Sequence, residues 1–201
     1  MRRRSGRRAY RSHDPYFLHN AAAGIPINHV PGQPPGPDRY AWAVPPTSGL
    51  EALGSPTEYR YDSPDAGVLE VFDNPYPAST WAVVLLCQEF TSLCPVTGQP
   101  DYGRLRIDYV PARHCVESKS LKLYLMRYRN EGAFHEACVN RVADDLAEAI
   151  APRYLRVYGD FNPRGGIAIK PLAVRAAPGL DAGEEERCLA LLAQAAGLAV
   201  T

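Results

Sequence analysis

The feature of the sequence that most constrains its fold is a change of hydrophobic period, from two to helical and back. Polar and apolar residues alternate over 104–110, as in a half-buried strand. From Glu117 the apolar residues follow helical spacing and predict one helix that ends near residues 130–132. A second helix is expected from about Phe134 to about Ile150, where Pro152 stops it.

Strands are predicted on both sides of these helices. Residues 80–90 are rich in β-branched and aromatic side chains, and residues 154–161 and 166–174 flank the turn sequence 162–165. The expected order is therefore ββααββ, an α+β fold in which an antiparallel sheet carries both helices on one face. A further amphipathic helix is expected from Gly183 to about Ala196.

The first 48 residues differ from the rest. They hold eight prolines, at positions 15, 26, 31, 34, 35, 37, 45 and 46, and the first 12 residues carry six arginines and no acid. We expect 1–48 to be an irregular extension, either a solvated tail or an arm on a neighbouring subunit, and 49–201 to be the folded domain. No apolar run suits a secretion signal or a membrane span, so a cytoplasmic protein is expected.

Composition and the absence of certain motifs argue against several classes of protein. Lys plus Arg equals Asp plus Glu, 22 each, so no overall field favours a nucleic-acid partner. The five cysteines include no CxxC pair, which argues against a disulfide scaffold or a zinc ribbon, and no metal site is expected. Neither a GxGxxG nor a Walker sequence is present, so a nicotinamide cofactor would not be held by a Rossmann fold.

Cys94 and Asp101 stand at the two ends of a turn-forming segment that contains Pro95, Gly98 and Pro100. A thiol can add to an electrophilic carbon, and a nearby carboxylic acid can deliver the proton that the addition needs. Taken alone, such a pair is more often a small buried cysteine and a turn residue. The functional interpretation therefore depends on other segments.

Three further segments accompany it: 116–125 (Val-Glu-Ser-Lys-Ser-Leu-Lys-Leu-Tyr-Leu), 134–138 (Phe-His-Glu-Ala-Cys) and 163–170 (Pro-Arg-Gly-Gly-Ile-Ala-Ile-Lys). With the Cys94 segment, they resemble the NADPH-dependent 7-cyano-7-deazaguanine reductases, the nitrile reductases of queuosine biosynthesis. The resemblance covers about residues 50–178. It implies the tunnelling fold and a homo-oligomeric ring, pentamer or decamer, with active sites between subunits.

The resemblance also implies a role for each catalytic residue. Cys94 would attack the nitrile carbon to form a thioimide, Asp101 would donate the proton, and two hydrides from NADPH would then give a primary amine. His135 would contact the substrate and pass protons in later steps. A thiolate suits the first step because a nitrile accepts hydride poorly until a soft nucleophile has added to it.

Substrate and cofactor residues follow in the same way. Glu136 matches the residue that holds the deazapurine ring, and a carboxylate can accept two hydrogen bonds from its N–H and NH₂ edge. The remaining residues implied to bind substrate are Val116, Glu117, Ser118 and His135. Those implied to bind NADPH are Lys119, Ser120 and Lys122, because lysines and a helix start suit phosphates. Arg164, Gly165 and Gly166 are expected to add a phosphate contact through close approach of the backbone.

Cys138 lies two residues beyond Glu136, so it could approach Cys94. We hypothesise a reversible Cys94–Cys138 disulfide that protects the nucleophile from over-oxidation. Cys87, Cys115 and Cys188 are expected to be structural.

Three alternatives remain at this point. An amidinotransferase acting on nitrile-modified tRNA would use the same Cys94 and Asp101, but it would not need the lysine segment for a hydride donor. A GTP cyclohydrolase would need zinc ligands, for which His114, Cys115 and Cys188 give no recognisable spacing. A non-catalytic purine-binding module would not need the nucleophile, the acid and the lysines together.

Overall fold

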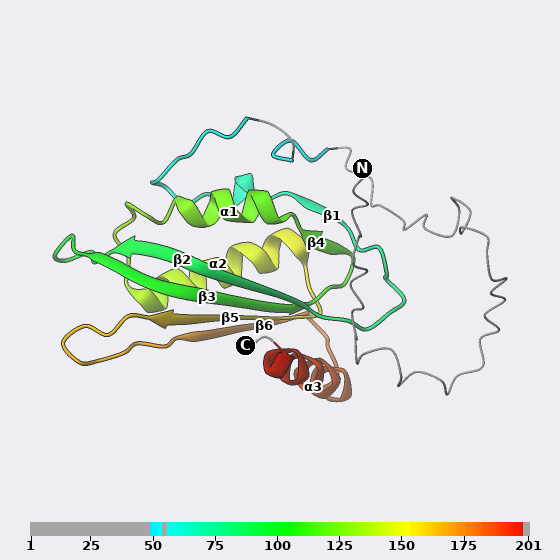
Figure 1. Ribbon diagram of the computed structural model, residues 1–201. Coiled ribbons are helices and arrows are strands. Elements are labelled where there is room, and N and C mark those ends of the chain that lie inside the picture. The colour runs from blue at the N-terminus through cyan, green and yellow to red at the C-terminus, as the bar shows by residue number, and fades with distance from the viewer. Residues whose placement is uncertain (1–48, 54–55, 199–201) are drawn as a thin grey trace, which may run out of the picture. The chain divides into compact units, whose positions relative to one another are not determined.

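A computed structural model describes residues 49–53 and 56–198 of the chain, so the expected extension 1–48 lies outside the described residues. Four strands form an antiparallel sheet in the order β2-β3-β5-β6 (Figure 1). They are β2 (Val83–Leu93), β3 (Pro100–Val110), β5 (Tyr154–Phe161) and β6 (Leu172–Ala176). A short 3₁₀ helix η3 (Ala66–Val68) precedes β1 (Val71–Asp73), which pairs with β4 (His114–Val116) in a separate two-stranded sheet.

Two helices, α1 (Ser118–Met126) and α2 (His135–Ile150), lie on one face of the four-stranded sheet (Figure 1). Alternate residues of β3 and β5 point towards them, and Ile107 and Val157, which face each other across the strand pair, are fully buried. They pack with Val139, Val142 and Leu146 of α2 in one hydrophobic core. The expected α+β fold, an antiparallel sheet with both helices on one face, is confirmed.

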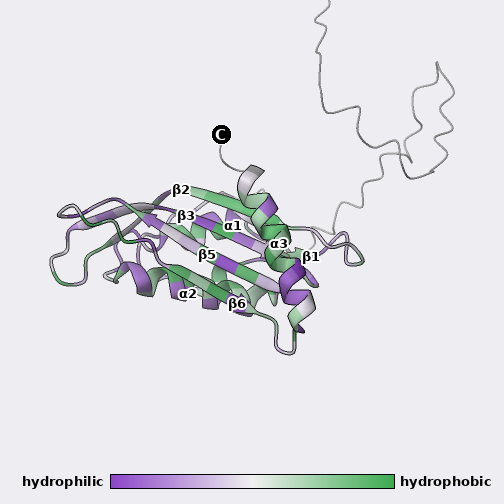
Figure 2. Cartoon of the chain, turned by 90° about the horizontal axis from the view of Figure 1, so that it is seen from below, coloured by the Kyte–Doolittle hydropathy of each residue, from purple (hydrophilic) through white to green (hydrophobic). Residues whose placement is uncertain are grey.

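The opposite face of the sheet carries α3 (Ala182–Leu198), which crosses one end of the strands (Figure 2). Cys188 and Leu192 of this helix pack on Val110 and Tyr154. Beside this cluster the buried Asp108 accepts hydrogen bonds from Arg106 at 2.9 Å and Arg156 at 3.0 Å. Paired charges of this kind allow a carboxylate to be buried on a sheet face.

Several element boundaries differ from the sequence-based expectation. The strand expected at 80–90 spans Val83–Leu93, and the next begins at Pro100 rather than Arg104, because the pairs Ser92–Asp101 and Leu93–Pro100 extend the ladder into the loop. Proline is tolerated there because it occupies the first position of the strand. The extended ladder therefore places Asp101 opposite Ser92 and ends at Leu93, the residue before Cys94.

The last strand was expected at 166–174 and instead runs over Leu172–Ala176. Residues 164–167 form a tight turn closed by hydrogen bonds between Arg164 and Ile167. Gly165 and Gly166 have φ values of 58° and 82°, which side chains of other residues rarely adopt. Because of this turn, regular pairing with β5 begins only at Leu172, later than the sequence pattern predicts.

A stability prediction follows from the packing of α2. Leu146 is fully buried in the core, so Leu146→Ala is expected to lower the free energy of unfolding by about 2–5 kcal/mol through lost burial and the cavity left behind. Urea unfolding followed by circular dichroism measures the change. Glu148→Ala, on the exposed side of the same helix, is the control and should change the free energy by less than about 0.5 kcal/mol.

Candidate active site

Cys94 follows β2 directly, at the end of the sheet where β2 meets the connection between α1 and α2. The N–H of Leu93 donates a hydrogen bond to the carbonyl of Glu131 at 2.9 Å, and the carbonyl of Leu93 accepts one from the N–H of Ala133 at 3.0 Å. Cys94 itself donates to the carbonyl of Gln99 at 2.8 Å and accepts from Gly98 at 2.9 Å. The nucleophile candidate is thus held in a closed turn, and the residue before it is bonded to Ala133, which lies two residues before the start of α2.

The surroundings of Cys94 favour its thiolate. Hydrogen bonds from the Thr97 side chain, and then from the backbone N–H groups of Thr97 and Val96, lower the pKa of the thiol to about 7, and Arg164 adds a smaller contribution. Hydrogen bonds to the charged form of an acid stabilise that form. By contrast, burial raises the pKa of the Cys87 and Cys138 thiols to about 11. Reactive thiols are those with a depressed pKa and some exposure, which Cys94 combines.

This difference gives a prediction about pH. Because the pKa of Cys94 is lowered to about 7, its thiolate and its alkylation by iodoacetamide should rise with pH and reach half of the maximum near pH 7. Peptide mass spectrometry after brief labelling from pH 5.5 to 9 follows each cysteine. Cys138, whose pKa is raised to about 11, is the internal control and should stay unmodified over this range. Labelling of Cys94 that begins only above pH 8.5 would contradict the assignment.

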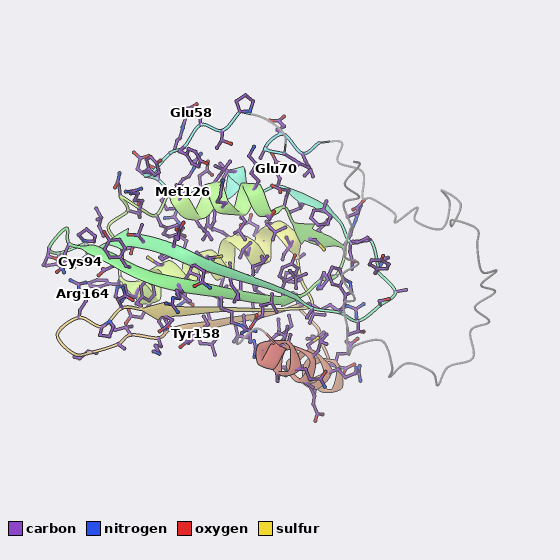
Figure 3. All side chains as sticks on the ribbon, in the orientation of Figure 1. Glu58, Glu70, Cys94, Met126, Tyr158 and Arg164 are labelled. Atoms are coloured by element: carbon purple, nitrogen blue, oxygen red, sulfur yellow. The ribbon has the colours of Figure 1, made fainter. Side chains whose placement is uncertain are left out.

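Asp101 is buried, with only 3% of its surface exposed, and two basic side chains contact its carboxylate. Arg164 donates from Nη1 to Oδ1 at 2.6 Å, and Nε2 of His135 lies 3.2 Å from Oδ2. Arg164 also donates from Nη2 to Oε1 of Gln99 at 3.2 Å. Figure 3 shows Cys94 and Arg164 at the same end of the sheet. The expected acid is therefore held by a guanidinium that also reaches the Cys94 loop.

His135 begins α2 and is buried against the sheet. Its ring stacks on Phe161, with ring centroids 3.9 Å apart and planes inclined by 10°. The contact between His135 Nε2 and Asp101 lacks hydrogen-bond alignment, so this buried nitrogen has no hydrogen-bond partner among the described residues. A buried polar atom without a partner is uncommon and is typical of a group that acts on a ligand. This position agrees with the role expected for His135.

Two glycines make room for Phe161 beneath that histidine. A Cβ atom on Gly159 would lie 2.7 Å from Cε2 of Phe161, and one on Gly103 would lie 2.9 Å from Cδ1. Either distance is a clash, so only glycine at both positions allows the Phe161 ring to lie on the sheet. Phe161, Gly103 and Gly159 were not identified from the sequence, where only the isolated glycines within two strand patterns could have indicated a close approach.

The expected substrate residues occupy different environments. Glu136 is exposed in the first turn of α2, so its carboxylate can reach a ligand. Val116 is buried in the core. The carboxylate of Glu117 caps α1, with Oε1 accepting from Lys119 N at 2.8 Å and Oε2 from Ser120 N at 2.7 Å. Val116 and Glu117 therefore hold the start of α1, while the exposed Ser118 is the member of this segment whose side chain can meet a ligand.

Among the expected cofactor residues, Ser120 requires a correction. It is fully buried, accepts a hydrogen bond from the backbone of Glu70 at 3.0 Å and donates one to the carbonyl of Glu117 at 2.8 Å. Because the hydroxyl is committed on both sides, Ser120 serves the fold, and we leave it out of the proposed cofactor contacts. Lys119 is half-buried, and Lys122 is exposed with its Nζ 3.3 Å from the hydroxyl of Tyr59.

A cavity of about 1030 Å³ forms an open groove between β2 and α1. Ser118, Lys122 and Arg129 line one side and Leu93 and Pro100 lie at one end, next in sequence to Cys94 and Asp101. The reactive groups themselves do not line it. We regard the groove as a place for a cofactor rather than for the reaction, because its volume suits a large ligand and it carries two cations for phosphates.

Arg164 was expected to contact a phosphate, together with Gly165 and Gly166. In this structure its guanidinium is instead paired with Asp101, and no atom within 4 Å would obstruct a Cβ at either glycine. The two glycines are therefore required by the left-handed backbone of the turn. Their close approach to a phosphate stays a prediction.

Cys94 and Cys138 are both free thiols. Burial raises the pKa of the Cys138 thiol, and the charge of Asp101 raises it further. Their hypothesised disulfide therefore stays a prediction for oxidising conditions. The described residues contain no group of three His, Cys, Asp or Glu side chains placed to hold a metal ion. Within the same residues, no helix is long and apolar enough to cross a membrane.

Comparisons with known proteins place the chain among relatives. Residues 100–179 match the family described as QueF-like protein. NADPH-dependent 7-cyano-7-deazaguanine reductase of Helicobacter pylori strain Shi470 is 49% identical over 143 residues, 71% of this chain and 97% of the relative. The enzyme of that name from Bacteroides thetaiotaomicron is 53% identical over 131 residues, 65% of this chain and 85% of the relative.

A crystal structure of the archaeosine synthase QueF-Like in the apo form is a more distant match. It covers 51% of this chain and 99% of its own, with a TM-score of 0.46 and 20% identity. The curated relatives, in contrast, match at about half of their residues over nearly their whole length. The chain therefore belongs to the family of NADPH-dependent 7-cyano-7-deazaguanine reductases.

Proposed function

We propose that the protein reduces the nitrile of 7-cyano-7-deazaguanine to the aminomethyl group, with NADPH as hydride donor, in queuosine biosynthesis. The observation that carries the proposal is that His135 and Arg164 both contact Asp101, while Arg164 also reaches the loop of Cys94, whose thiol has its pKa lowered to about 7. The relatives that share about half of their residues with this chain carry the name of that activity. Catalysis is assigned to residues 49–201.

The reaction would begin with bond formation between the Cys94 sulfur and the nitrile carbon. The C≡N bond becomes C=N, the nitrogen takes up a proton through Asp101, and a covalent thioimide results. His135, stacked on Phe161 with an unpartnered Nε2, is placed to hold the substrate and to move protons afterwards. Glu136 would accept hydrogen bonds from the N–H and NH₂ edge of the base.

We assign the cofactor to the groove between β2 and α1, which Lys122 and Arg129 line. Lys122, which lines this groove, would meet the phosphates, and we propose that Lys119, which does not line it, adds a second ammonium group near the same helix start. When bound, NADPH supplies two hydrides, each matched by one proton, which takes the nitrile to a primary amine. The chain's own contribution is to hold the carbon on Cys94 for the first hydride. The C–S bond must then break, which returns the thiol to Cys94 and leaves an imine in the site to accept the second hydride.

We also propose a homo-oligomeric ring, pentamer or decamer, with sites between subunits and no direct nucleic-acid partner. The four-stranded sheet leaves β2 and β6 as edges, which are available for pairing. Exposed apolar side chains on the face opposite α1 and α2, such as Leu86 at 46% and Leu172 at 58%, would be covered in such an assembly. Light scattering after size exclusion measures the mass, and a fully active monomer would contradict the ring.

A cytoplasmic location fits this chemistry, since reducing conditions keep a nucleophilic thiol free. The activity test mixes the protein with 7-cyano-7-deazaguanine and NADPH under reducing conditions, and follows the loss of nicotinamide absorbance and the mass of the product. Two NADPH oxidised for each aminomethyl product formed is the expected result. No oxidation would overturn the proposal. Incorporation of ammonia without NADPH oxidation would favour the amidinotransferase alternative.

A further inference from the structure

Arg164 occupies a position that a cofactor contact alone does not explain. It lies in the turn between β5 and β6, 63 residues from Asp101 in sequence, yet its Nη1 donates to Oδ1 of Asp101 at 2.6 Å. Its other terminal nitrogen donates to Gln99 Oε1 at 3.2 Å, on the residue whose carbonyl accepts from Cys94 N. The guanidinium thus spans both ends of the loop from residue 94 to residue 101.

The charges around this loop are few. The carboxylate of Asp101 faces Arg164 from the β5–β6 turn, His135 from α2 and the buried thiol of Cys138. Cys94 faces Thr97 and Val96 of its own loop, and Arg164. Arg164 is therefore the cation shared by the expected nucleophile and the expected acid.

We propose that Arg164 is a positioning residue for the covalent step: it holds the Cys94 thiol and the Asp101 carboxyl group as a pair that shares one proton and one negative charge. This inference deepens the proposed function and rests on it for the chemistry of the nitrile.

The charge count of the step explains why an arginine suits this position. Before attack the pair holds one proton, on sulfur or on the carboxyl group, and one negative charge, which the guanidinium compensates in either case. As the S–C bond forms, the proton leaves the pair for the nitrile nitrogen. The sulfur becomes neutral and the charge stays on Asp101, in the ion pair with Arg164 seen here. Arginine remains protonated throughout, so it cannot take the proton away from the reaction.

A cofactor contact and a positioning role predict different defects. The covalent step needs no NADPH, so a residue that only binds NADPH phosphates would leave thioimide formation unchanged. Loss of the guanidinium should instead leave the charge of Asp101 uncompensated, oppose ionisation of Cys94 and raise its pKa.

The test uses the full chain with Arg164→Gln and Arg164→Lys, and Lys170→Gln as the matched control. Lys170 belongs to the same segment and pairs with the half-exposed Asp160 at 3.1 Å, so its loss removes one positive charge outside the site. The first measurement is iodoacetamide alkylation of Cys94 against pH without any ligand. We expect Arg164→Gln to shift the midpoint upwards by up to about one pH unit and to slow labelling at pH 7 by about two- to fivefold. Arg164→Lys should recover part of the rate, and Lys170→Gln should match the parent protein.

The second measurement follows the thioimide adduct by intact mass with 7-cyano-7-deazaguanine and no NADPH. Arg164→Gln should slow adduct formation by about tenfold or more. An unchanged alkylation midpoint together with an unchanged adduct rate, and only a higher KM for NADPH, would overturn the proposal. If the parent protein forms no adduct, the proposed function fails, while the alkylation profile still decides whether Arg164 acts on Cys94.

Discussion

Cys94→Ala should abolish nitrile reduction, lowering turnover by roughly four orders of magnitude or more and removing the covalent adduct. The variant lacks the atom that bonds the nitrile carbon, and neither Cys87 nor Cys138 can replace it, because burial raises the pKa of both thiols to about 11. NADPH oxidation measures turnover, and intact mass after incubation with 7-cyano-7-deazaguanine alone measures the adduct.

Cys188→Ala is the matched control for that experiment. Cys188 is a buried cysteine that packs with Leu192 and Tyr154 on the opposite face of the sheet, away from Asp101 and His135. Its replacement should reduce stability slightly and leave turnover per folded protein unchanged. Equal turnover of Cys94→Ala and the parent protein would mean that the reaction does not pass through this thiol.

Asp101→Asn should lower the rate of thioimide formation by about 10²–10⁴-fold, the usual contribution of a positioned acid or base. The amide keeps the size of the side chain, but it cannot deliver the proton, and it leaves Arg164 without its counter-ion. Single-turnover mass measurements without NADPH isolate this step. The substrate concentration for half-saturation should change much less than the rate, because Asp101 is not expected to hold the base.

Asp160→Asn controls for the loss of a sheet carboxylate. Asp160 is half-exposed on β5 and pairs with Lys170, so its replacement should leave the rate within about twofold. Because the Asp101 carboxylate is buried, the melting temperature of each variant is measured beside the rate, which separates a loss of folding from a loss of catalysis. A folded Asp101→Asn protein that forms the adduct at the parent rate would exclude Asp101 as the proton donor.

The sequence predicted the elements whose ends carry strong local signals. Both ends of β5 were placed correctly, because Pro152 precedes the strand and Asn162-Pro163 follows it. The expected helix 134–150 agrees with α2 to within one residue, and the left-handed Ala151 before Pro152 ends it. Local residue preferences were sufficient in these places.

Other features depend on partners far away in the sequence and could not be predicted from it. The early start of β3 depends on pairing with the end of β2, and β4 forms because His114–Val116 meets β1. The same reason applies to the site. The pair of Arg164 with Asp101 joins the turn after β5 to the start of β3, so sequence spacing gave only the weaker expectation of a phosphate contact. Likewise, nothing in the pattern distinguished Glu117 as a helix cap from Glu117 as a ligand.

The two hydrogen bonds that join Leu93 to Glu131 and Ala133 make the site sensitive to fraying at the sheet margin. β2 is an edge strand, and the connection between α1 and α2 is bound to its last residue. Opening of this short seam would separate the thiol from the imidazole without disturbing the buried core. Deuterium uptake at the amides of Leu93 and Ala133 therefore reports whether the active site is assembled. It does so even while the protein as a whole stays folded.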